Sequence, residues 1–178
     1  TRRVIVAAAL QRLGSPASIS SMTIGGISAA RDAQQQTGNV NDHTLEFWSA
    51  VVPTGTTATI VVTPNVGSQR CSIAVFRAVD AAAAASHTNG GTNSSNAIST
   101  TLNIPANGFG IAAAYDNGNT TYTWSGLTER SDQAGGGNNT LSSAMDNFTA
   151  AQTGLSITAT QASTSSPQAI LAAAWGPA

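Results

Sequence analysis

Residues 19–28 have the sequence Ile-Ser-Ser-Met-Thr-Ile-Gly-Gly-Ile-Ser, and this stretch indicates the fold more sharply than any other part of the chain. Its two adjacent glycines, Gly25 and Gly26, separate two short stretches in which apolar and small polar residues are mixed. A two-residue type I′ turn needs a positive φ at both central positions, and glycine adopts such angles without steric cost. The stretch therefore predicts a tight β-hairpin.

Period-two alternation of apolar and small polar residues recurs along the chain, whereas helical periodicity is scarce. Within residues 57–63, for example, Ala58, Ile60 and Val62 share one face. Thr57, Thr59 and Thr63 lie on the opposite face. Because successive side chains of a strand point to opposite faces, such segments predict strands with one face in a core and one in water. The predicted strands are 57–63, 98–104, 155–160, a buried strand beginning at 4–6, 19–24, 27–33, 43–52, 70–79, 109–115, 120–125, 140–149 and 168–175.

Turn-forming residues punctuate these strands at intervals of about ten residues, which is typical of sandwiches and barrels. We expect an all-β fold, an antiparallel β-sandwich that is jelly-roll-like, with about ten or more short strands. No repeat of fixed period and no change of composition divides the chain, so residues 1–178 are expected to form a single domain. The sequence starts in mid-pattern at Thr1 without Met, which favours a processed protein or the C-terminal part of a longer chain.

Three segments are expected to lie outside the strands. Asp80 precedes five alanines, residues 81–85, and this pattern predicts a single helical turn capped by the aspartate. The segments 87–96 and 134–139 are rich in Gly and Asn and are predicted to be a polar loop and a flexible tip. The alanine run has no functional explanation in the sequence.

The composition excludes several classes of function. Only 8% of the 178 residues are charged, against about 25% in an ordinary domain, and the seven basic residues are all arginine. Small neutral residues replace the charges: the chain has 23 Thr, 20 Ser, 17 Gly and 13 Asn. No basic stripe exists for binding nucleic acid, and no apolar run approaches the ~18 residues that a membrane span needs. With 41% hydrophobic residues and a net charge of -1, the chain is not disordered through charge repulsion.

Few residues have the chemistry of a reactive or metal-binding site. Cys71 lies in an apolar stretch and is expected to be a small buried thiol. His43 lies near Asp42 and Glu46, but a zinc site normally needs three or four well-supported ligands. We therefore favour a surface histidine at the start of a strand. The segment 116–119 lacks the alternating acids of a calcium loop and is interpreted as a plain turn.

The sequence also lacks the motifs of several large enzyme classes. No nucleophile elbow, zinc-protease helix, phosphate-binding loop or dinucleotide-binding glycine pattern occurs. Paired carboxylates of the glycosidase kind would have to come from eight scattered acids, and nothing in the pattern favours them. We expect no catalytic residues, no metal ligands and no cofactor.

Tyr122 and Trp124 are the candidate contact residues for a glycan or a protein partner. They are two residues apart in a predicted strand and therefore face the same way, where their rings could stack on a sugar. The alternative is that both rings pack in the core of the sandwich. Trp175, near the end of the last predicted strand, is expected to lie in the core.

A series of hydrophobic strands and turns in a particular order covers nearly the whole chain. The segments are 3–9, 19–27, 45–48, 52–56, 58–63, 74–80 and 169–175. This order resembles a β-sandwich module of tail, fibre and head-decoration proteins of tailed bacteriophages, which also recurs in large secreted bacterial proteins. The resemblance implies a jelly-roll-like fold used as a building block, with no shared catalytic residues.

Two functions from different classes follow. The first is a non-enzymatic virion structural protein of a bacteriophage, a head-decoration, head-fibre or tail-fibre module that forms a homo-oligomer. Its partners would be copies of itself or other virion proteins, because strand edges with few charges suit a part whose edges are occupied by neighbours. The alternative is a secreted carbohydrate-binding or adhesive module, in which Tyr122 and Trp124 contact a host-surface glycan. An enzyme is less favoured than either.

Overall fold

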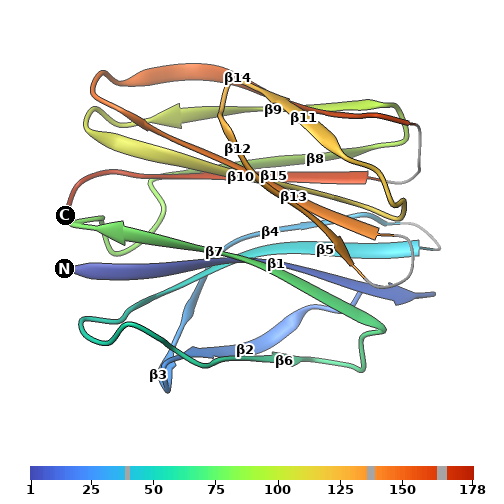
Figure 1. The fold of residues 1–178 in the computed structure, drawn as a ribbon, viewed down its shortest axis with the longest axis horizontal. Helices are drawn as coiled ribbons and strands as arrows, with labels where there is room; N and C mark the ends of the chain where they lie inside the picture. Colours follow the sequence, from blue (N-terminus) through green and yellow to red (C-terminus); the bar gives the residue numbers. More distant parts are fainter. Residues whose placement is uncertain (39–40, 136–138, 164–167) are drawn as a thin grey trace.

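The computed structural model describes residues 1–38, 41–135, 139–163 and 168–178, with the side chains of 41, 42 and 135 left out (Figure 1). Within these residues the chain forms fifteen strands and no helix, which confirms the predicted all-β class. In chain order the strands are β1 (Arg2–Leu13), β2 (Ile19–Ile24), β3 (Ile27–Ser28), β4 (Ala30–Gln36), β5 (Asn41–Val51), β6 (Ile60–Pro64), β7 (Arg70–Val79), β8 (His87–Asn93), β9 (Ala97–Ile104), β10 (Gly108–Asp116), β11 (Tyr122–Ser125), β12 (Glu129–Gly135), β13 (Asn139–Phe148), β14 (Gln152–Gln161) and β15 (Gln168–Trp175).

The strands form four antiparallel sheets that are stacked in four layers (Figure 1). One inner sheet has the order β4-β5-β1-β7, and the outer sheet β3-β2-β6 covers it. The other inner sheet has the order β12-β13-β10-β15-β8 and is covered by β11-β14-β9. The expected antiparallel sandwich is therefore present, with four layers in place of the two of an ordinary sandwich.

Each of the three interfaces between the layers has its own hydrophobic core. The central core joins the two inner sheets and contains Phe47, Phe109 and Trp175. Trp175 is fully buried, as predicted, and stacks on Phe109 with the ring centroids 5.4 Å apart. The central strands β1, β10 and β15 of the inner sheets are buried on both faces, which explains their alanine runs, because small side chains let closely stacked layers approach. These alanine runs are 7–9, 112–114 and 172–174.

The two halves of the chain repeat one strand order. The sheet β4-β5-β1-β7 of the first half recurs as β12-β13-β10-β15 in the second, and the outer pair β2-β6 recurs as β11-β14. The sequence showed no repeat because the spacing varies: β1, β5 and β7 begin at residues 2, 41 and 70, and their counterparts at 108, 139 and 168. The halves differ in their additions: β3 extends the outer sheet of the first half only, and β8 and β9 extend the sheets of the second half only.

The predicted hairpin is confirmed. Ile24 pairs with Ile27, and the two glycines between them have φ of +60° and +78°, as a type I′ turn requires. Strands β2, β7 and β15 also begin and end where the alternation predicted. Local pattern and turn chemistry therefore agree with the tertiary fold over these segments.

Other expectations about the elements were wrong. Residues 87–93, predicted as loop, form β8, and β12 was not predicted, because both are polar strands at the edge of a sheet. The helical turn after Asp80 does not form: Asp80 has a φ of +51°, and Ala81 makes a β-bridge to Pro177. The predicted tip at 134–139 lies in part outside the described residues.

Candidate interaction site

Tyr122 and Trp124 lie on the same side of β11, but neither forms an open platform. Tyr122 is only 2% exposed, and its hydroxyl accepts a hydrogen bond from Nε2 of Gln161 at 2.9 Å. Burial raises the pKa of this hydroxyl, which therefore stays protonated. Trp124 is half-buried and donates from Nε1 to Oγ of Ser142 at 2.8 Å. Tyr122 thus has no free ring face for a sugar, and only part of Trp124 is accessible.

His43 is fully buried, contrary to the expectation of a surface residue. It lies on the face of β5 that points toward the other inner sheet, where its ring meets Tyr115 edge-on at 5.0 Å between centroids. Glu46 is three residues further along the strand and points to the opposite face, so the two side chains cannot hold one metal ion. The Asp42 side chain lies outside the described part. Among the described side chains, no group of three His, Cys, Asp or Glu is placed to hold a metal ion.

A buried polar cluster surrounds His43 at the end of the central core. Asn139 donates from Nδ2 to the hydroxyl of Tyr115, and Arg70 donates to Oε1 of Gln11 at 2.8 Å. Neither ring nitrogen of His43 has a hydrogen-bond partner among the described residues. Burial, with a smaller contribution from the charge of Arg70, lowers the pKa of His43 to about 4. The imidazole is therefore neutral at pH 7, and the cluster links β1, β5, β7, β10 and β13.

The segment 116–119 connects β10 to β11, in agreement with a plain turn. Asp116 is fully buried and accepts from the backbone N–H of Thr140 at 3.1 Å and from Nε2 of Gln161 at 2.7 Å. The carboxylate thus ties the ends of three strands together. Its oxygens are engaged by the protein, which favours a structural role over calcium binding.

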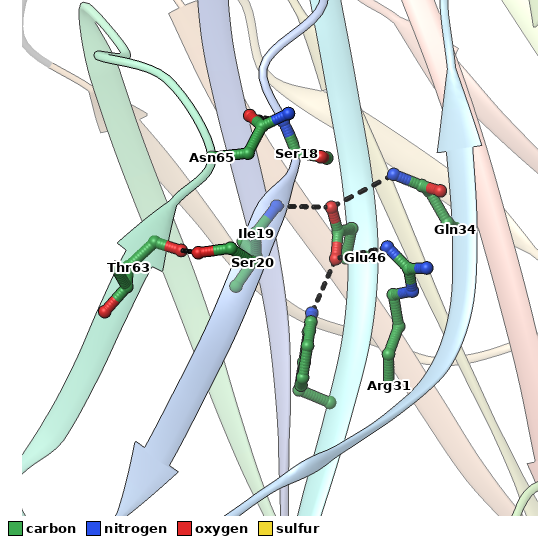
Figure 2. A network of polar contacts seen from close by, with 9 residues as sticks. Ser18, Ile19, Ser20, Arg31, Gln34, Glu46, Thr63 and Asn65 are labelled. Atoms are coloured by element: carbon green, nitrogen blue, oxygen red, sulfur yellow. Dashed lines mark hydrogen bonds and ion pairs between the residues drawn. The ribbon is translucent and has the colours of Figure 1, made fainter.

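Glu46 is a second buried carboxylate, and sequence reasoning missed its role (Figure 2). It accepts from the backbone N–H of Ile19 at 2.8 Å, from Nε2 of Gln34 at 3.1 Å and from Nε1 of Trp48 at 2.6 Å. The guanidinium of Arg31 lies 3.8 Å away. The network fastens β2 of the outer sheet to β5 of the inner sheet. A single acid within an apolar strand was the only sign of this role in the sequence.

β7 is an edge strand that carries two of the most exposed large apolar side chains among the described residues, Val75 and Val79. The even-numbered residues Ala74 and Phe76 point into the central core. The side chains on the other face are uncovered: Val75 is 52% and Val79 is 58% exposed. Cys71, on the same face, is also exposed, so the expectation of a buried thiol was wrong. The apolar context was a misleading signal because the outer sheet ends at β6 and leaves this face of β7 open.

Two hollows of about 320 Å³ each flank the open edge of β7. Val75 and Phe76 line both. The first hollow lies between β7 and the outer sheet, and Arg77 lines it without making a hydrogen bond or ion pair to any described residue. The second hollow opens toward β12 and β13. The first hollow is also lined by Val4, Ile24, Val52 and Ile60. The second is also lined by Gln133 and Met145.

The equivalent strand of the second half shows what covers such an edge. β15 pairs along its edge with β8, and β9 packs over its outer face. The outer-face residues Ile170, Ala172 and Ala174 are consequently 0% exposed. The described strands of the first half include no counterpart of β8 or β9. The open edge and uncovered face of β7 are therefore the candidate interaction site.

Comparison with known proteins identifies no relative that would assign this site. No family model, no curated protein and no solved structure matches the chain. In the described part of the chain there is also no helix long and apolar enough to cross a membrane.

Proposed function

We propose that this protein is a non-enzymatic structural module of a bacteriophage virion, which acts through self-association and surface display. The observation that carries the proposal is the open edge of β7, where Val75 and Val79 are more than half exposed. An edge strand with unpaired backbone groups and an apolar face recruits further strands, and proteins that remain monomeric normally guard such edges.

The construction of the sheets supports a role as a rigid building block. On β9, for example, Ile98, Leu102 and Ile104 are buried, and Ser99, Thr101 and Asn103 on the other face are small, polar and exposed. The outer faces of the outer sheets are therefore exposed to solvent but nearly uncharged. Such a surface suits a part held among neighbours better than an enzyme that attracts charged substrates.

The location in a virion is supported by the resemblance of the strand order to head-decoration, head-fibre and tail-fibre modules. Carbohydrate binding, the alternative, loses support because Tyr122 is buried and no longer forms an exposed ring pair with Trp124. Under this proposal, other virion proteins are binding partners as well as further copies of the chain.

Light scattering coupled to size exclusion tests the self-association directly. We expect a defined oligomer at micromolar concentration, in both 0.15 M and 1 M salt, because strand pairing and apolar contact are little screened by ions. A clean monomer at the highest soluble concentration would contradict the proposal.

A further inference from the structure

We propose that the occupant of the open β7 edge is β7 of a second copy, with the two strands paired antiparallel across a two-fold axis. This inference rests on the proposed self-association and names the surface that performs it. The second half of the same chain supports the mode of contact, since its equivalent strand β15 carries the antiparallel strand β8 on the corresponding edge.

Among the described edge strands, β7 has the fewest features that protect an edge against pairing. β4 and β12 are interrupted by register shifts, at residues 31–33 and 129–131. β3 and β11 are only 2 and 4 residues long, and β6 ends in Pro64. β7 runs for 10 residues with no register shift, proline, lysine or acid. Bulges, short length, proline and charge are the usual protections against edge pairing, and of these β7 carries only the charges of Arg70 and Arg77.

The two edge strands that remain are occupied by contacts within the chain. On β9, the backbone carbonyl of Thr101 accepts from Nδ2 of Asn89 at 3.1 Å. The carbonyl of Ala97 accepts from Nδ2 of Asn93 at 2.7 Å. Both donors come from β8, which itself lies beside β4 and contains two adjacent glycines. Neither edge is as available as that of β7.

The hydrogen bonds between β7 and β1 determine which residues of β7 direct their backbone N–H and C=O groups to the open edge. The N–H of Asp80, next in line after β7, donates to the carbonyl of Thr1 at 2.7 Å. In an antiparallel strand the N–H and C=O of one residue point to the same side, and the side alternates along the strand. The even-numbered residues therefore pair with β1, and the odd-numbered ones, such as Ile73 and Val75, direct their groups to the open edge.

Two registers pair nearly the whole of β7 with its copy and let the odd-numbered residues of the two strands form hydrogen bonds to each other. With Ala74 on the axis, Cys71 faces Arg77 of the second copy. With Val75 on the axis, Cys71 faces Val79 instead. Neither register opposes Arg77 to its own copy, so no like charges face each other directly. The contact is isologous and closes at two copies, as in the commonest oligomers.

The two hollows fit this occupant. Side chains of an added strand alternate between the two faces of the sheet, so one set reaches the hollow beside the outer sheet and the other reaches the hollow toward β12. The second copy would present Val75 and Ile73 to the first hollow, whose lining is mainly apolar.

Disulfide cross-linking tests the pairing, because Cys71 is the only cysteine of the chain. Opposed residues on paired strands lie within the Cα separation that a disulfide tolerates. Under mild oxidation we expect a covalent dimer from Arg77→Cys or from Val79→Cys, and its loss when Cys71→Ser is added. The matched control is Val61→Cys, which adds an equally exposed cysteine on β6 (Val61 is 50% exposed) and is expected to remain uncross-linked.

Cross-linking of the control to the same extent, or of neither β7 variant, would overturn the inference. A cross-link of unsubstituted Cys71 to its own copy would also overturn it, since neither register brings these two residues together.

A second measurement separates this inference from the proposed function. Val75→Glu introduces a charge at a site that is already half exposed, so the fold is expected to survive, which circular dichroism checks. We expect the oligomer seen by light scattering to become monomeric. An oligomer that resists Val75→Glu overturns the β7 pairing and leaves self-association standing, whereas a monomeric wild-type protein overturns both.

Discussion

Acidification from pH 7 to pH 4 is expected to reduce the free energy of unfolding by about 3 kcal/mol through His43 alone. The side chain is 0% exposed, and neither ring nitrogen has a hydrogen-bond partner in the part of the chain that the structure describes. Burial, followed by the charge of Arg70, lowers the pKa of His43 from 6.5 to about 4. Between these two values the unfolded chain protonates the imidazole, and the folded protein keeps it neutral.

The sign and size follow from this difference in proton binding. Where the unfolded state binds more protons, stability rises with pH, so the contribution of His43 is fully present above pH 6.5. It falls as the pH drops and levels off below about 4. At 1.36 kcal/mol for each pKa unit, the difference between the unfolded pKa of 6.5 and the folded pKa of about 4 corresponds to a loss of about 3 kcal/mol in the free energy of unfolding. This is a large part of the 5–15 kcal/mol that stabilises a typical domain.

Urea unfolding at pH 4, 5, 6 and 7, followed by tryptophan fluorescence, measures the effect in the wild-type protein and in His43→Phe. Phenylalanine preserves an aromatic ring against Tyr115 and removes both unpartnered nitrogens. The carboxylates titrate in both proteins, so the difference between their pH profiles isolates His43. Arg70→Gln is expected to raise the pKa of His43 and to flatten the profile in part. Identical profiles for the wild-type protein and His43→Phe would refute the reasoning.

Three further substitutions test the packing. Glu46→Ala is expected to cost about 3–5 kcal/mol, because it leaves buried donors without an acceptor; urea unfolding with less than about 1 kcal/mol of loss would contradict this role. Gly126→Ala places a Cβ 2.2 Å from a backbone oxygen of β14, so its melting temperature should fall well below that of Gly14→Ala, which has nearly the same φ (+86° against +88°) but open space. Equal melting temperatures would mean that φ strain alone matters. Ser142→Ala removes the acceptor of the Trp124 indole and should cost about 1–2 kcal/mol and shift the tryptophan emission; an unchanged spectrum would count against this hydrogen bond.

Local sequence signals predicted a large part of the fold. The glycine pair at 25–26 determines a type I′ turn through its φ angles alone, and the alternation in 98–104 places Ile98, Leu102 and Ile104 on the buried face of β9. Such features depend on the backbone and on nearest neighbours. They were therefore available without knowledge of the rest of the chain.

Predictions from the local sequence failed where strands far away along the chain determine whether a residue is buried or paired. β8 is a polar segment that becomes a strand because β15 offers it an edge. His43 is buried because Tyr115, far along the chain, covers it. Cys71 is exposed because none of the described strands covers that side of β7. In each case the local composition pointed to the opposite environment.

The candidate site shows the same division. The sequence by itself determined that residues 70–79 form a strand and that Val75 and Val79 lie on one face with Cys71, because side chains alternate along any strand. It also determined that the chain is nearly uncharged and rich in Ser and Thr. Only the tertiary structure decided that this face stays open, since the exposure of a strand depends on which other strands pair with it and pack over it. The two halves share one strand order, but β8 and β9 cover the edge in the second half alone.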